Sequence, residues 1–138
     1  MNNNVFTSNI NSIQQLHEEA NGIQEYMKQT ADLNDPTSLT IRLSNLDSYM
    51  ARLGEMLITA KALRSTAKTS FVNEREDLNK MTATVSNRII DAHMQDYNIL
   101  YDRLDNMYET IRALTRDLVT QISYIKEQMR NLQFYNNN

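Results

Sequence analysis

The chain has no cysteine and no tryptophan, and only two glycines and one proline in 138 residues. The lack of cysteine excludes disulfides, thiolate metal sites and a cysteine nucleophile. With so little glycine and proline, the chain also lacks the turn residues of a multistranded sheet, a dinucleotide-binding domain or a phosphate-binding loop. The composition therefore predicts an all-α fold, and the length suits one domain over residues 1–138.

Long apolar runs and an excess of positive charge are missing as well. No stretch approaches the ~18 consecutive apolar residues of a spanning helix, and the N-terminus has neither the basic nor the apolar region of a signal peptide. The 14 Lys and Arg residues are outnumbered by 17 Asp and Glu, which gives a net charge of -3. We expect a soluble protein with no membrane partner, and the charge argues against general electrostatic binding to nucleic acid.

The sequence does contain three segments with apolar residues at helical spacing. The first covers about 8–33, and Thr7 or Ser8 is a candidate N-cap. The clearest boundary follows it, because Asp35 suits an N-cap and Pro36 suits the first helical position. We therefore predict that the second helix begins at Pro36 and runs to about residue 70 or beyond.

The second segment carries a seam, which we define as a row of residues separated by alternating steps of four and three. Its members are Leu39, Leu43, Leu46, Met50, Leu53, Leu57 and Ala60. This spacing is typical of a coiled coil. The pattern weakens over the polar residues 65–70. We expect a loop at about 82–87, with Thr84 or Ser86 as the next cap.

The third segment, about 87–133, has the longest seam, in which Thr115 is the one polar member. The seam consists of Ile90, Met94, Tyr97, Tyr101, Leu104, Tyr108, Ile111, Thr115, Leu118, Ile122, Ile125, Met129 and Leu132. A flanking row of Leu100, Met107 and Leu114 widens the apolar stripe. A stripe of this width predicts that the helix contacts at least two neighbours.

The length of the third helix predicts self-association. About 46 residues at ~1.5 Å each span roughly 70 Å. A compact domain of this size has a diameter under about 40 Å. No glycine or proline between residues 97 and 132 would kink the helix. We therefore expect its exposed seam to pair with another copy in a homo-oligomer, or with another protein.

The two histidines do not form a metal motif. His17 is not part of His-Glu-x-x-His, and neither His17 nor His93 completes Glu-x-x-His. No serine lies in a nucleophile elbow. We interpret both histidines as ordinary surface or seam residues and predict no cofactor, no metal and no enzyme activity.

Acidic residues on the third helix lie beside arginines, including Arg103 and Arg112. We interpret them as a solvated face with ion pairs one turn apart, such as Glu109–Arg112, each contributing a few tenths of a kcal/mol.

Tyrosines on the third seam are open to two interpretations. Tyr97, Tyr101 and Tyr108 lie on one side of the helix, where their bulk suits a core shared with the other two helices. Tyrosine is also enriched at protein interfaces. The candidate contact surface comprises these tyrosines together with Thr115, Leu118 and Ile122.

Basic residues gather on one face of the second helix. Lys61, Arg64 and Lys68 are spaced i, i+3 and i+7 in a segment, 38–70, with five bases and two acids, whereas residues 1–37 hold one base and five acids. Such a face could meet phosphate, and these three residues are the candidate nucleic-acid site. The alternatives are a solvated face or one that docks on the acidic first helix.

The run RLSNLDSYMARLGEMLITAKALRSTAK (42–68) and the run ISYIKEQMR (122–130) resemble small helical bacteriophage proteins encoded near DNA-replication and recombination genes. The two runs cover about a quarter of the chain and contain no chemically defined motif. The resemblance implies a phage origin, a non-enzymatic accessory role, and a location in the host cytoplasm or in a phage particle assembled there. It implies no site residues.

Together these observations predict an elongated antiparallel three-helix bundle or coiled coil, completed by oligomerisation. The leading hypothesis for function is a structural or protein-interaction module that binds a host or phage protein. The alternatives are a nucleic-acid-binding accessory factor and an anti-defence inhibitor that acts by binding a host protein.

Overall fold

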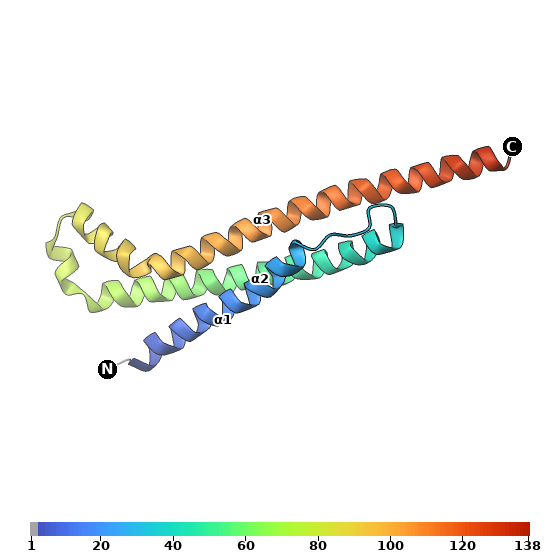
Figure 1. The fold of residues 1–138 in the computed structure, drawn as a ribbon. Helices are drawn as coiled ribbons and strands as arrows, with labels where there is room; N and C mark the ends of the chain where they lie inside the picture. Colours follow the sequence, from blue (N-terminus) through green and yellow to red (C-terminus); the bar gives the residue numbers. More distant parts are fainter. Residues whose placement is uncertain (1–2) are drawn as a thin grey trace.

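The computed structural model describes the backbone of residues 3–138 and the side chains of residues 12–138. Over these residues it has three α-helices, α1 (Asn3–Met27), α2 (Pro36–Glu74) and α3 (Ala83–Asn136), and a 3-10 helix, η1 (Glu76–Lys80). α2 and α3 form a long antiparallel hairpin, and α1 lies against the hairpin in the same direction as α3 (Figure 1). The predicted all-α fold of three mutually packed helices is confirmed, and the molecule is elongated.

The start of α2 agrees with the prediction from sequence. Asp35 is the N-cap and Pro36 is the first helical residue. The Asp35 carboxylate accepts hydrogen bonds from the Ser38 hydroxyl (2.7 Å) and the Thr37 backbone N–H (3.0 Å). These bonds favour the charged carboxylate and lower the pKa of Asp35.

The buried side of α2 follows a seven-residue repeat. Its buried members are Leu39, Leu46, Leu53, Ala60 and Ala67, together with Met56 one turn from the row. The intervening seam residues Leu43, Met50 and Leu57 are partly buried against the same core. Each fully buried leucine or methionine stabilises the fold by about 1.5–3 kcal/mol.

α3 buries residues from both of its predicted rows. The buried residues are Met94, Tyr97, Leu100, Leu104, Met107, Ile111, Leu118 and Ile122. Because Leu100 and Met107 belong to the flanking row, the apolar surface is wider than a single seam. α3 contacts both α1 and α2, as this width predicted.

The polar residues 65–70 continue α2 rather than ending it. Ala67 is buried among them, and one turn later Phe71 stacks on His93 of α3 at 3.9 Å between ring centroids. Packing against α3 thus maintains the helix where the local sequence favours it least.

The predicted loop at 82–87 is wrong, because the turn between α2 and α3 lies earlier, at 75–82. Thr82 rather than Thr84 or Ser86 caps α3, accepting a hydrogen bond from the Val85 N–H (3.4 Å). Ser86 instead donates its hydroxyl to the Leu78 carbonyl (2.7 Å). Leu78 is buried, so η1 anchors the turn to the helices.

α1 differs from its prediction at both ends. It begins at Asn3, so Thr7 and Ser8 lie within the helix and do not start it; their side chains lie outside the described residues. It ends at Met27 rather than near residue 33, and Arg42 satisfies the Met27 carbonyl at this helix end with a hydrogen bond (3.2 Å). Asp32 then accepts a bond from the Asn34 N–H (3.0 Å), which closes a turn.

Candidate functional site

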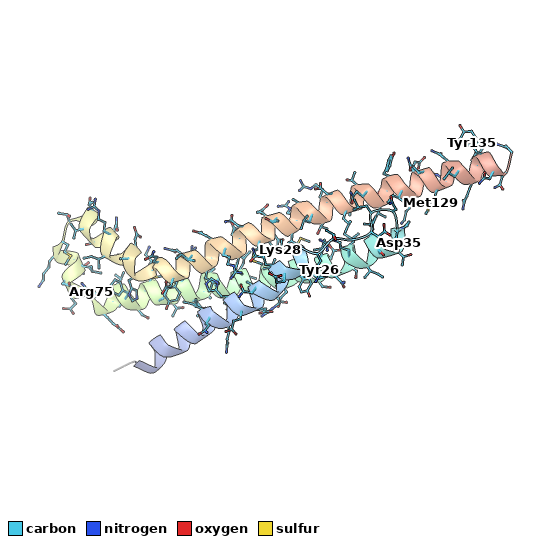
Figure 2. The ribbon with its side chains drawn as sticks, viewed as in Figure 1. Tyr26, Lys28, Asp35, Arg75, Met129 and Tyr135 are labelled. Carbon is cyan, nitrogen blue, oxygen red and sulfur yellow. The ribbon has the colours of Figure 1, made fainter. Side chains whose placement is uncertain are left out.

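The last turns of α3 extend beyond the rest of the molecule. We call residues 126–136 the overhang; all of them are exposed. Figure 2 shows Met129 and Tyr135 past the level of Asp35, where α2 begins. Along the predicted seam the exposed fraction rises from 6% at Leu118 and 7% at Ile122 to 46% at Met129 and 62% at Leu132. The seam therefore continues after its intrachain partners have ended.

The side chains of this segment divide into a mainly apolar face and a charged face, on which Phe134 also lies. At about 100° of rotation per residue, an arc of about 140° contains the polar Gln128 and Asn136 and five apolar or aromatic residues. They are Tyr124, Ile125, Met129, Leu132 and Tyr135, which we call the stripe. All are exposed except Ile125, which is partly buried against the core. Lys126, Glu127 and Arg130 lie on the other side, where Arg130 forms an ion pair with Glu127.

An open groove lies next to the overhang, on the side where α1 has already ended. It has a volume of about 320 Å³ and is lined by the α1–α2 connection, α2 and α3. Leu33, Leu39, Leu114 and Leu118 give it apolar walls, and Gln121 lies at the overhang side. The groove therefore occupies the position that a longer α1 would have covered.

Part of the predicted contact surface is core. Tyr97, Leu118 and Ile122 are buried against the chain's own helices, and each has only 6–7% of its surface exposed. Tyr101 and Tyr108 are partly buried against the same core.

Thr115 is also only partly buried. Its hydroxyl donates to the Ile111 carbonyl one turn earlier (2.8 Å), so its polar group is satisfied within α3. The exposed part of the seam begins further along the helix than the sequence predicted.

The predicted basic face of α2 is divided. Lys61 and Lys68 are exposed, but the Arg64 guanidinium lies 4.1 Å from the centroid of the Tyr101 ring. A cation held over an aromatic face stabilises helix packing. Arg64 thus joins α2 to α3, and two lysines remain fully open to a phosphate ligand.

Arg103 was predicted on a solvated face, but it joins α3 to α1. It donates to His17 Nδ1 (2.9 Å), the His17 carbonyl (3.3 Å), Asn21 Oδ1 (2.6 Å) and Gln24 Oε1 (3.0 Å). We call these four residues the Arg103 cluster. The spacing of 17, 21 and 24 on one face of α1 was the available signal. By contrast, the predicted Glu109–Arg112 pair is present (3.8 Å) and exposed.

The His17 imidazole accepts a proton less readily than usual. A guanidinium can only donate, so Nδ1 must carry the lone pair that receives its bond. Burial lowers the pKa of His17 and the charge of Arg103 lowers it further, while the carboxylate of Asp96 opposes the shift.

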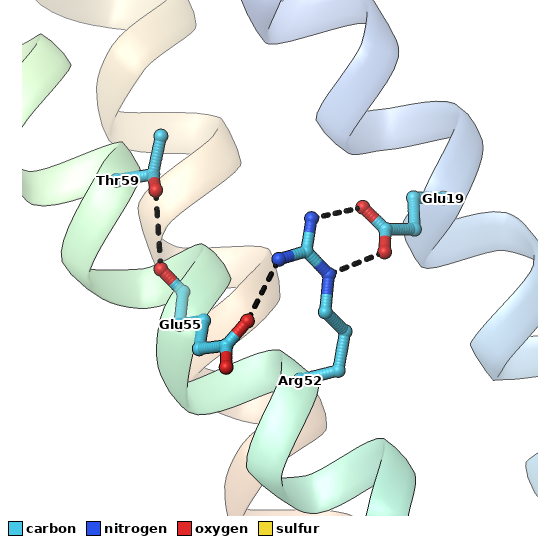
Figure 3. A network of polar contacts seen from close by, with 4 residues as sticks. All are labelled: Glu19, Arg52, Glu55 and Thr59. Carbon is cyan, nitrogen blue, oxygen red and sulfur yellow. Dashed lines mark hydrogen bonds and ion pairs between the residues drawn. The ribbon is translucent and has the colours of Figure 1, made fainter.

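A second arginine joins α1 to α2 (Figure 3). Arg52 donates from Nε and Nη2 to the two carboxylate oxygens of Glu19 (2.5 and 2.8 Å) and from Nη1 to Glu55 (2.9 Å). The bonds from Arg52 lower the pKa of Glu19. The acidic first helix does meet the basic second one, through Arg52 and Arg42 rather than through Lys61, Arg64 and Lys68.

Neither histidine belongs to a metal-binding group: across the described residues, no three His, Asp or Glu side chains gather as metal ligands. Within residues 3–138, no helix is long and apolar enough to cross a membrane. Comparisons with models of known protein families, with curated proteins and with solved structures gave no match to this chain.

Proposed function

We propose that the protein is a non-enzymatic helical module that binds another protein chain through the stripe on α3. The observation that carries this proposal is the rise in exposure along one unbroken seam, from buried at Ile122 to largely exposed at Leu132. The residue types and their spacing continue, and only the covering helices are missing.

The chemistry of the stripe supports a protein ligand. Clustered exposed apolar side chains mark interaction surfaces. Tyrosine and methionine are enriched at such surfaces, and a tyrosine ring can bury its face while its hydroxyl stays in water. The resemblance of residues 42–68 and 122–130 to bacteriophage proteins adds a phage origin to the proposal.

The test compares two variants that add equal charge. Met129→Glu with Leu132→Glu places two carboxylates in the stripe, and Ser123→Glu with Gln133→Glu places two outside it. All four positions are exposed, so both variants should retain the helical circular dichroism and the melting temperature of the wild type. Self-association is measured by light scattering, and binding to other proteins by affinity capture from lysate.

The proposal predicts that the stripe variant loses a binding event that the control retains, whether the bound protein is another copy or a different chain. Equal binding by both variants, or no binding by the wild type in either assay, would overturn it.

A further inference from the structure

We infer that the stripe binds a second copy of this chain, with the two overhangs side by side and antiparallel around a twofold axis near residue 127. This inference rests on the proposed function and names its partner. It is carried by the spacing of the seam, the position of the groove and the placement of charge.

The spacing of the seam fits an antiparallel copy of itself. With the axis at residue 127, Met129 lies level with Ile125 of the second copy and Leu132 lies level with its Ile122. These positions alternate by three and four on both chains, as helix pairing requires. The pair thus continues the same seam by which α3 already packs on α2.

The groove of each copy lies where the C-terminal end of the other copy's overhang would contact it. In this arrangement Tyr135 is level with residue 119 of the other copy, between Leu118 and Gln121 on the groove wall. Tyr135 is the most exposed member of the stripe, at 78%. Its ring would enter the space of about 320 Å³ that α1 leaves uncovered. Each copy would supply one ring and one groove.

The charges allow this pairing. Lys126, Glu127 and Arg130 lie off the stripe, so two stripes meet without placing like charges between them. Because the same patch is used on both chains, the contact closes on itself and stops at a dimer. The stripe and the groove of this chain fit each other in position. Binding to a different protein would not require that fit, so the fit favours a second copy.

The arrangement fixes the shape of the dimer. The 54 residues of α3 span about 80 Å at ~1.5 Å per residue. If the two α3 helices overlap only around residue 127, the dimer is a rod about 130 Å long. A thin rod of this length has a radius of gyration of roughly 38 Å. A dimer paired along its full length would stay near 80 Å, and the same thin-rod relation gives a radius of gyration of roughly 23 Å.

The experiment combines light scattering with small-angle X-ray scattering on the full chain at tens of micromolar. We expect twice the 16.1 kDa mass together with the longer shape. Met129→Glu with Leu132→Glu should halve the mass, and the control Ser123→Glu with Gln133→Glu should leave it unchanged.

Three results would overturn the inference: a monomeric wild type, a dimer of the shorter shape, or a stripe variant that remains dimeric. A monomer that captures another protein through the stripe would overturn the second-copy pairing while retaining the proposed function. A monomer with no stripe-dependent capture would overturn both.

Discussion

His17 and Arg103 place two basic side chains in contact, and the contact holds only while the imidazole is neutral. Protonation would remove the acceptor at Nδ1 and set a positive charge 2.9 Å from the guanidinium. Asp96 offsets part of this repulsion without cancelling it, since the pKa of His17 remains below its ordinary value of 6.5.

The stability of the fold should therefore fall as the pH is lowered just below 6.5. In that window the unfolded chain binds a proton at His17 that the folded chain does not, so acid favours unfolding. The lowered pKa values of Glu19, Asp35 and Asp77 act only at more acidic pH, because their ordinary values are 4.5 or below. Denaturant unfolding between about pH 7.5 and 5.5 measures the slope.

His17→Gln should flatten this dependence, and His93→Gln, which leaves the Arg103 cluster intact, should not. An unchanged slope in His17→Gln would show that the cluster does not couple to pH.

Thr115 is a second residue whose replacement should change the stability of the fold. Thr115→Leu should stabilise the protein by about 1 kcal/mol, because leucine has the higher helix propensity and adds apolar area at a partly buried site. Thr110→Leu is the matched control, since Thr110 makes the same hydroxyl-to-carbonyl bond (2.9 Å, to Asn106) but is exposed. Thermal unfolding should show a larger gain at Thr115, and equal gains would mean that residue 115 buries nothing.

Among the three helices, α1 is the one whose stability we expect single substitutions to change most. It packs on the hairpin through Ile13, Leu16, Ala20 and Ile23, and the polar contacts of Arg52 and Arg103 add to them. Its free side contains Gly22, where an added methyl group would have open space within 4 Å.

Gly22→Ala should raise the stability of α1 by up to about 1 kcal/mol, because alanine loses less backbone entropy in a helix. Thermal unfolding and amide hydrogen exchange measure the gain. If α1 opens separately, the added protection will be confined to its amides. A lower melting temperature would show that Gly22 requires its freedom, contrary to the open space around it.

Periodicity and capping predicted much at the level of elements, and tertiary contacts account for the rest. Asp35 and Pro36 marked a boundary through local chemistry alone, and the two rows on α3 predicted its two neighbours. The region 82–87 was misjudged because the anchoring of Leu78 places the turn earlier, and packing of Ala67 keeps the polar run 65–70 helical against a weak local preference. At the candidate site, spacing revealed the seam, but only the position of the α2 N-terminus at Pro36 determines where on α3 the seam becomes exposed.

The charge of the whole molecule argues against the alternative function of nucleic-acid binding. Its net charge is -3, and Arg64 of the basic face is engaged with Tyr101. We expect no tight binding of single- or double-stranded DNA at either ~50 or ~200 mM salt, where phosphate contacts would give a steep salt dependence. Lys61→Glu with Lys68→Glu is the informative variant because it spares the Arg64 packing. Tight binding that this variant loses would restore the alternative.

The turn between α2 and α3 also bears on the order in which the chain folds. Residues on either side of Leu78 are close in sequence, so bringing them together costs little chain entropy, and each further turn of contact extends a pair already formed. α1 has its partners Arg52 and Arg103 on two different helices. Both lie side by side only when the hairpin has closed, so we expect α1, which precedes the hairpin in the sequence, to dock last.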